Sequence, residues 1–196
     1  AGERAAHLLQ EAGIAVVTYL VEEDRPIPDQ ANGGLAGMKL PKNCDAVVGV
    51  GSGVINDISK IVAATAKLPL VCVATAPSMD GYASDGAAMI LKGMKETVKA
   101  GLPRAIVADV DVLKNAPMEM IKAGYGDIVG KYSALNDWKL SRVVNDEYFC
   151  DYIYNLTMVQ IDRTLKLASG ILGRNEESIK TLMEALVIIG ILMSFA

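Results

Sequence analysis

The first 110 residues contain four short apolar runs in which polar residues do not alternate with apolar ones. They occupy residues 15–20, 45–50, 68–74 and 104–109. Unbroken apolar runs are typical of strands in a sheet that is covered on both faces. Helical patterns at residues 3–12 and 54–66 separate some of the runs, and a strand–helix–strand order at this spacing indicates parallel pairing through right-handed crossovers. The pattern therefore predicts an α/β domain built on a parallel sheet.

The remainder of the chain is predicted to consist of consecutive helices. Asn115 followed by Pro117 is typical of a helix start, with Asn115 as the capping residue. The next helix is expected to bury a stripe at three-to-four spacing. The members of this stripe are Ile128, Tyr132, Leu135, Trp138 and Arg142. We therefore predict an α/β domain over residues 1–114 and an all-α domain over residues 115–196, with a surface loop at residues 22–34.

Composition excludes several classes of protein. The chain is 52% hydrophobic and 21% charged, which indicates a folded core rather than a disordered segment. A net charge of −4 argues against sequence-independent nucleic-acid binding, which needs a basic surface. The three cysteines form no Cys-x-x-Cys pair, so a zinc finger or redox dithiol is not predicted. Scattered thiols favour a reducing compartment, which we take to be the cytoplasm.

The last segment, LMEALVIIGILMSFA at residues 182–196, is apolar over about 15 residues. It is shorter than the 18 or more residues of a typical membrane span. A buried helix is therefore favoured over a membrane anchor. Neither end of the chain carries the signals that usually open or close a domain, and we expect these residues to be part of a longer protein.

A glycine-rich turn follows the second apolar run, in the segment DAVVGVGSGVINDISK. Glycine lets the backbone bend sharply and approach a ligand closely. A helix that starts at this turn offers free N–H groups and the positive end of its dipole, which suits a pyrophosphate. The segment lacks the full G-x-G-x-x-G pattern because Asn56 stands at the last position. The residues alone leave two interpretations open, a nucleotide site or a tight turn that binds nothing, and Asp57 is either a ligand contact or a carboxylate that offsets the helix dipole.

A polar loop follows the third apolar run, in the segment VATAPSMDGYASDGAAM. It carries Thr75, Ser78, Asp80, Ser84 and Asp85. Ligands of open parallel sheets bind at the carboxyl ends of the strands, where this loop is predicted to lie. It is either one wall of a ligand crevice or a solvated turn.

Asp127 is the third candidate, since it follows Gly124 and Gly126 and precedes Lys131 by four residues. Residues four apart on a helix lie on the same face. Asp127 is either a helix cap with a surface ion pair to Lys131 or a ligand of a metal or substrate.

Four segments together resemble one superfamily. They are GSGVINDISK, TAPSMDGYAS, PRAIVADVDVL and GDIVGKYSALNDWKL. In this order and at this spacing they resemble the superfamily of iron-containing alcohol dehydrogenase, glycerol dehydrogenase, 3-dehydroquinate synthase and sn-glycerol-1-phosphate dehydrogenase. Asp rather than Glu at position 127, and Gly81 after Asp80, favour the bacterial glycerol-1-phosphate branch. The resemblance implies a dehydroquinate synthase-like fold, here incomplete, with a Rossmann-like first domain and a helical second domain.

The resemblance also implies roles for individual residues. The dinucleotide, NAD or NADP, would contact Gly53, Val54, Ile55, Asn56, Asp57, Thr75, Ala76, Pro77, Ser78 and Ser84. Asp80 would bind substrate, and Asp127 would be the catalytic residue that binds both substrate and a divalent metal, zinc or nickel. The family holds its metal with two further histidines in the helical domain. His7 lies before the glycine turn and matches neither, so both histidines are expected beyond residue 196, and the 196 residues alone are expected to be inactive.

The activity implied is hydride transfer that interconverts sn-glycerol 1-phosphate and dihydroxyacetone phosphate. The expected partner is this small phosphorylated substrate, with no nucleic acid and no membrane span, in a homodimer. Two alternatives stay open: a dehydrogenase of glycerol or another polyol or alcohol, and a nucleotide-binding module that lacks the metal histidines and does no redox chemistry.

Overall fold

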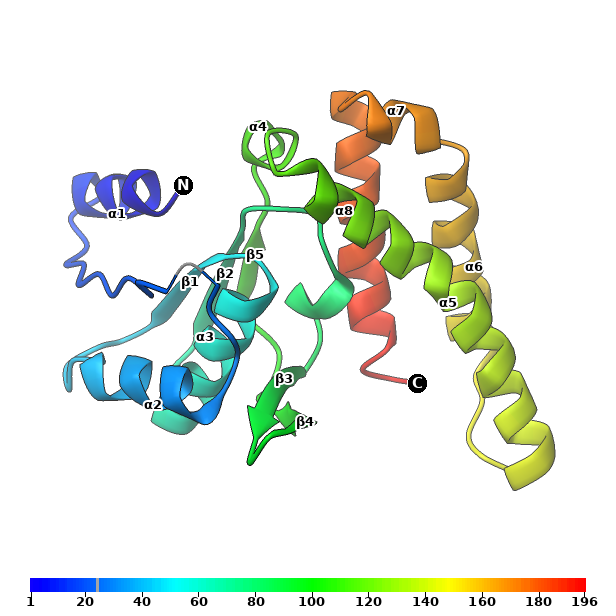
Figure 1. The fold of residues 1–196 in the computed structure, drawn as a ribbon, viewed down its shortest axis with the longest axis horizontal. Coiled ribbons are helices and arrows are strands. Elements are labelled where there is room, and N and C mark those ends of the chain that lie inside the picture. The colour runs from blue at the N-terminus through cyan, green and yellow to red at the C-terminus, as the bar shows by residue number, and fades with distance from the viewer. Residues whose placement is uncertain (24) are drawn as a thin grey trace. The chain divides into compact units, whose positions relative to one another are not determined.

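The computed structural model describes residues 1–23 and 25–196, which form two compact units (Figure 1). The first unit comprises Ala1–Thr75 and Asp85–Val107, and the second comprises Ala76–Ser84 and Ala108–Ala196. The contacts thus assign the loop at residues 76–84 to the second unit, which the sequence did not predict. The domain boundary between residues 114 and 115 stays a prediction.

A parallel sheet of three strands lies in the first unit. Its strands are β1 (Val47–Gly51), β2 (Leu70–Ala74) and β5 (Ala105–Val107), in the order β1-β2-β5. Val47 is opposite Leu70, and Val71 is opposite Ala105. The predicted parallel sheet and three of its four predicted strands are therefore confirmed.

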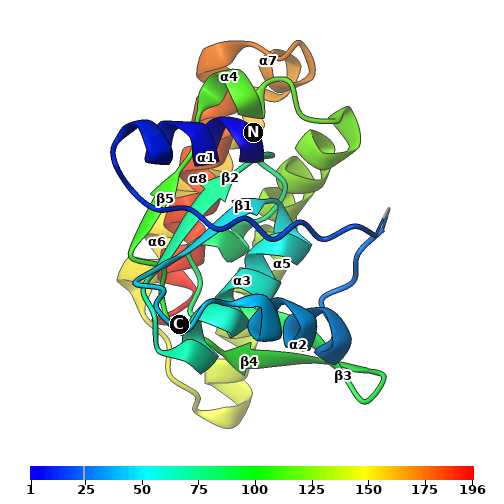
Figure 2. The ribbon, with the colours of Figure 1, turned by 90° about the vertical axis from the view of Figure 1, so that its left-hand side faces the viewer.

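Helix α3 (Gly53–Ala66) connects β1 to β2 and packs on the sheet through Ile58, Val62 and Ala63, all of which are buried. Helix α2 (Gln30–Lys39) lies beside α3 (Figure 2), and α1 (Gly2–Glu11) precedes both in the chain. The helices predicted at residues 3–12 and 54–66 are confirmed. Burial of the apolar face of α3 against β1 and β2 contributes hydrophobic stabilisation to this unit.

Two local predictions for this unit are wrong. Residues 15–20 form no strand, and Val17 and Leu20 are largely exposed, since the segment has no hydrogen-bonded partner strand among the described residues. A strand needs such a ladder to satisfy its backbone groups. The loop predicted at residues 22–34 ends early because α2 begins at Gln30, where the Asp29 side chain caps the helix by accepting from the backbone N–H of Asn32. Asp24 lies outside the described residues.

A β-hairpin completes the first unit, formed by β3 (Gly86–Leu91) and β4 (Met94–Lys99), which pair antiparallel. Lys92 and Gly93 form its turn with φ of 50° and 82°. Two consecutive positive φ values are typical of the type I′ turns that connect tightly paired strands. This hairpin was not predicted from the sequence.

The second unit is helical apart from its loops, as predicted. Its helices are α4 (Val110–Leu113), α5 (Met118–Asn145), α6 (Asp151–Leu165), α7 (Ala168–Leu172), α8 (Glu176–Leu192) and the short 3-10 helix η1 (Asp80–Tyr82). Helix α8 contacts each of the others and buries Ile179, Leu182, Leu186 and Ile189 completely (Figure 1). The buried part of this apolar segment, up to Leu192, therefore lies in the core of the unit, whereas Met193 and Phe195 are exposed. Within the described part of the chain, no helix is long and apolar enough to cross a membrane.

The start of α5 differs from the prediction. Pro117 precedes the helix directly, while the side-chain amide of Asn115 donates to the carbonyl oxygen of Asp111 instead of capping α5. Of the predicted buried stripe, Ile128 and Leu135 are buried but Tyr132 is 57% exposed. Arg142 is also exposed. The packed face of α5 is thus narrower than its apolar pattern suggested.

Candidate functional site

The glycine turn sits where the sequence placed it, between the carboxyl end of β1 and the start of α3. Gly53 is the first residue of α3, and Ser52 precedes it in an extended conformation without a side-chain cap. The backbone N–H of Thr75 donates to the carbonyl oxygen of Gly51 at 3.2 Å, so Thr75 lies beside the turn. The first N–H groups of a helix have no partner within it. The start of α3 can therefore bind an anion such as a pyrophosphate through Gly53, Val54 and Ile55.

Two other glycines of this turn are explained by packing. A Cβ on Gly49 would lie 2.5 Å from Ser59 Oγ, and one on Gly51 would lie 2.5 Å from Ile55 Cβ. Side chains at these positions would separate α3 from β1. The glycines are therefore consistent with a tight turn that binds nothing. They are also consistent with a nucleotide site, because close packing of α3 on β1 brings the start of the helix to the edge of the sheet.

Asn56 and Cys72 connect α3 to the sheet. Asn56 is 3% exposed, and the Cys72 thiol donates to its Oδ1 at 3.2 Å. Burial raises the pKa of the Cys72 thiol to about 11, so it stays protonated at neutral pH. This supports the interpretation of Cys72 as a small core residue, and it leaves the Asn56 side chain engaged in the core.

Asp57 lies one turn into α3, half-buried against the hairpin. Its carboxylate accepts from the side-chain amide of Asn56 at 3.4 Å and from the backbone N–H of Ala88. Burial raises its pKa from 3.8 to about 6, although Lys60 and these hydrogen bonds act in the opposite direction. Asp57 therefore holds the first strand of the hairpin to α3.

Asp57→Asn is expected to stabilise the fold at pH 8 and to leave stability nearly unchanged at pH 4. The native carboxyl binds its proton more tightly than the unfolded one, so the wild type loses stability as pH rises from about 3.8 to about 6. The gain at pH 8 is expected to be about 1–2 kcal/mol, because partial exposure screens the full effect. Urea unfolding at both pH values measures it, with the exposed Asp45→Asn as the matched control. Equal effects at both pH values would contradict the assignment.

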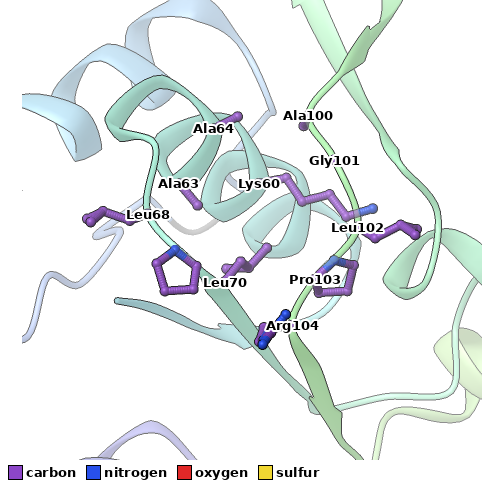
Figure 3. Close-up of a pocket in the computed structure, with 11 residues that line it drawn as sticks. Lys60, Ala63, Ala64, Leu68, Leu70, Ala100, Gly101, Leu102, Pro103 and Arg104 are labelled. Atoms are coloured by element: carbon purple, nitrogen blue, oxygen red, sulfur yellow. The ribbon is translucent and has the colours of Figure 1, made fainter. Parts of the chain in front are cut away.

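A cavity of about 650 Å³ in the first unit is not this site (Figure 3). Lys60 and Arg104 line it together with apolar residues around the start of β2. It thus opens at the amino ends of β2 and β5, whereas ligands of parallel sheets bind at the carboxyl ends.

The loop at residues 76–84 carries most of the remaining predicted residues. Ala76 and Pro77 are buried, and the Tyr82 hydroxyl donates to the carbonyl oxygen of Ala76 at 2.9 Å. The Ser84 hydroxyl donates to the carbonyl oxygen of Gly81 at 3.2 Å, and Ser78 is half-buried. The predicted residues therefore fall into two groups: Gly53 to Asp57 with Thr75 in the first unit, and Ala76, Pro77, Ser78, Asp80, Ser84 and Asp127 in the second.

Asp80, Asp127 and Lys131 form one cluster in the second unit. Lys131 Nζ lies 2.6 Å from Asp80 Oδ2 and 3.3 Å from Asp127 Oδ1, while the backbone N–H of Asp80 donates to Asp127 Oδ2 at 2.8 Å. Burial alone would lower the pKa of Lys131, but the two carboxylates outweigh it and raise the pKa, so the ammonium stays charged. Asp127 lies inside α5, so the helix-cap interpretation is wrong. The predicted ion pair with Lys131 is confirmed, and the structure brings together the two acids for which the family resemblance implies substrate binding.

The described residues do not by themselves suit a metal ion. They contain no group of three or more His, Cys, Asp or Glu side chains placed to bind one, and both oxygens of Asp127 already face Lys131 or the Asp80 amide. His7 lies on exposed α1, where its Nε2 is 3.4 Å from Glu11. His7 is therefore a surface residue, away from the candidate site residues in the sequence.

Lys60 is a buried residue of the glycine-turn segment that the sequence analysis missed. It is 1% exposed, and its Nζ donates to the carbonyl oxygen of Gly86 at 2.9 Å. Lys60 lies three residues after Asp57, and residues three apart share a helix face. This spacing could have indicated that Lys60 and Asp57 act on the same neighbouring element. Asp57 and Lys60 thus connect α3 to the hairpin through hydrogen bonds to the backbone of β3.

Comparison of sequences supports one family. Residues 1–117 match the family described as iron-containing alcohol dehydrogenase. The chain is 40% identical to glycerol-1-phosphate dehydrogenase [NAD(P)+] of Geobacillus thermodenitrificans over 156 residues, which are 80% of this chain and 39% of that protein. It is 36% identical to the protein of the same name from Bacillus licheniformis over 195 residues, which are 98% of this chain and 49% of that protein.

Solved structures show the same fold. Glycerol dehydrogenase from Schizosaccharomyces pombe superposes with a TM-score of 0.80 at 19% identity, over 97% of this chain and 50% of that one. An iron-containing alcohol dehydrogenase from Thermotoga maritima gives 0.73 at 20% identity, over 98% and 56% of the two chains. The chain thus spans about half the length of the relatives that it matches. On the match over residues 1–117, the chain belongs to the iron-containing alcohol dehydrogenase family.

Proposed function

We propose that the protein containing this chain is an NAD(P)-dependent dehydrogenase that interconverts sn-glycerol 1-phosphate and dihydroxyacetone phosphate. The observation that carries the proposal is the 36% identity to glycerol-1-phosphate dehydrogenase [NAD(P)+] across 98% of this chain. Fold neighbours with other substrates are about 20% identical, so they carry no weight in the choice of substrate.

The start of α3 supports dinucleotide binding in this proposal. Its first N–H groups, at Gly53, Val54 and Ile55, lie at the carboxyl end of β1 and fit the charge of a pyrophosphate. The nicotinamide side would be contacted by Thr75, which lies beside the turn, and by the loop that follows it. The bound nicotinamide supplies the hydride chemistry, and the protein binds and orients the reactants.

Asp80 and Asp127 are the proposed substrate-binding residues, with Asp127 as the catalytic one. Their carboxylates are held by Lys131, and carboxylates at such a position can accept hydrogen bonds from the two hydroxyl groups of sn-glycerol 1-phosphate. The proposed metal, zinc or nickel, would need the two histidines expected elsewhere in the longer protein. We derive no step through it, because the described residues lack a complete set of donors. The inactivity of the 196 residues alone, the homodimer and the cytoplasmic location stay predictions.

Substrate kinetics test the proposal directly. The full-length protein, assayed with NADH and with NADPH, is expected to reduce dihydroxyacetone phosphate with a kcat/KM at least about 100-fold above that for dihydroxyacetone. A charge-assisted contact to the phosphate contributes about 1.5–3 kcal/mol, and two such contacts suffice for this ratio. An equal or inverted ratio would favour an enzyme of free glycerol or another alcohol. Binding of the dinucleotide without any turnover would favour the non-catalytic module.

A further inference from the structure

The loop at residues 76–84 is docked on the helical unit through the backbone of Asp80. Asp127 Oδ2, on α5, accepts from the Asp80 N–H at 2.8 Å. The same residue begins η1, which packs against α8. A loop held at its backbone by two long helices has little freedom to shift.

Two helical glycines make this docking possible. A Cβ on Gly124 of α5 would overlap the carbonyl oxygen of Pro77, and a Cβ on Gly190 of α8 would overlap the carbonyl oxygen of Asp80. Glycine is unfavourable inside a helix because it loses more conformational freedom on folding than other residues. Both positions have ordinary helical backbone, so their conformation does not require glycine. The close approach of the loop does require it, because there is no room for a Cβ.

Lys131 fixes the side chain of the same residue. Its Nζ lies 2.6 Å from Asp80 Oδ2, and its side chain is only 17% exposed. Such a charge-assisted contact is short and strong compared with one between neutral groups. The second carboxylate, Asp127, lies 3.3 Å from the same ammonium and keeps it from turning away.

We propose that Lys131, Gly124 and Gly190 are positioning residues that hold Asp80 in place for its substrate. The role in catalysis rests on the proposed function, in which Asp80 contacts the substrate. The docking of the loop is a property of the helical unit and can be measured whether or not the protein turns over that substrate.

The glycine contacts are tested with alanine variants of the full-length protein. Gly124→Ala and Gly190→Ala are expected to speed hydrogen–deuterium exchange of residues 76–84 at least tenfold and to lower kcat/KM by about 100-fold, the size of effect that a displacement near 1 Å can cause. Gly126→Ala and Gly130→Ala lie on the same helix as Gly124, with no atom within 4 Å of the added Cβ. These two controls are expected to leave both measurements unchanged.

The charge of Lys131 is tested with a pair of variants. Lys131→Met keeps an unbranched side chain that is one atom shorter and removes its charge, so it is expected to raise KM for dihydroxyacetone phosphate at least tenfold while KM for the dinucleotide stays constant. Lys131→Arg restores a cation and is expected to recover most of the loss. A merely structural role would lower the melting temperature in Lys131→Met without this division between the two KM values.

Three results would overturn the inference. They are unchanged exchange of residues 76–84 in both glycine variants, faster exchange with kcat/KM retained, and equal KM for wild type and Lys131→Met. If the wild type does not act on dihydroxyacetone phosphate, the proposed function fails, and the exchange measurement still decides whether the loop is docked as described. The experiment therefore separates the two failures.

Discussion

Gly53→Val in the full-length protein is expected to weaken binding of NADH or NADPH by about 100-fold. A branched side chain at the first residue of α3 stands where the pyrophosphate would approach the backbone N–H groups. A hydrogen bond to a charged group contributes about 1.5–3 kcal/mol, so the loss of one or two such bonds gives this change in Kd. Isothermal titration calorimetry with each dinucleotide measures the effect.

Gly34→Val is the matched control for Gly53→Val. Gly34 lies on α2 of the same unit, exposed, with no atom within 4 Å of an added Cβ. It carries the same change in side chain away from the glycine turn and is expected to bind dinucleotide like the wild type. Wild-type affinity in Gly53→Val, with the control also unchanged, would remove the start of α3 from the site.

Asp127→Asn is expected to lower kcat/KM for dihydroxyacetone phosphate by about 100-fold to 1000-fold while the fold is retained. The amide keeps the size of the side chain and can still accept the Asp80 N–H through its oxygen, but it loses the negative charge 3.3 Å from Lys131. Removal of one polar group that acts at the reacting centre typically costs 100-fold to 1000-fold. Because the Asp80 contact survives in this variant, a loss of activity reports the charge of Asp127.

Asp137→Asn is the control for that variant, since Asp137 is exposed on the same helix. Its steady-state kinetics and its melting temperature are both expected to match the wild type. Full activity in Asp127→Asn would refute the catalytic assignment of Asp127. A large fall in its melting temperature would instead show that the cluster with Lys131 serves mainly to hold the helical unit together.

The sheet and most helices could be predicted because their patterns are local. A few consecutive residues are enough to indicate each of these elements. Examples are the unbroken apolar runs at β1 and β2 and the glycine turn before α3. Residues 15–20 are also rich in β-type residues, yet they form no strand. A run of β-type residues shows only that a strand can form, and a partner must supply its hydrogen bonds.

The hairpin and α2 were missed for different reasons. Lys92-Gly93 between β3 and β4 is a turn signal that was overlooked, although lysine at a positive φ makes it weaker than Asn-Gly. Helix α2 contains three glycines within QANGGLAGMK, so its intrinsic propensity is poor. It exists because Asp29 caps it, because the Asn32 side chain bonds the carbonyl oxygen of Ile27, and because α3 packs beside it. The Asp29 cap is a local signal that was overlooked, whereas the packing against α3 is a tertiary interaction that no local pattern contains.

The candidate site was predicted as separate pieces. The ion pair of Asp127 and Lys131 follows from helical spacing, but the contact of Lys131 with Asp80 joins residues that are distant in sequence. Gly124 was noted only as preceding Asp127 at a possible helix start, whereas it lies inside a continuous helix against Pro77. Long-range juxtapositions of this kind depend on the packing of α5 and α8, which the sequence leaves undetermined.

The division of the chain has a practical consequence for protein engineering. The backbone passes from one unit to the other at three places, after Thr75, after Ser84 and after Val107. No uninterrupted fragment therefore consists of one whole unit and nothing else, and a truncation after Val107 would leave the segment 76–84 without the helices that hold it. A chimaera that exchanges the helical unit with that of a relative must transplant this short segment together with residues 108–196, or the grafted α5 and α8 will meet a loop whose shape they were not selected to fit.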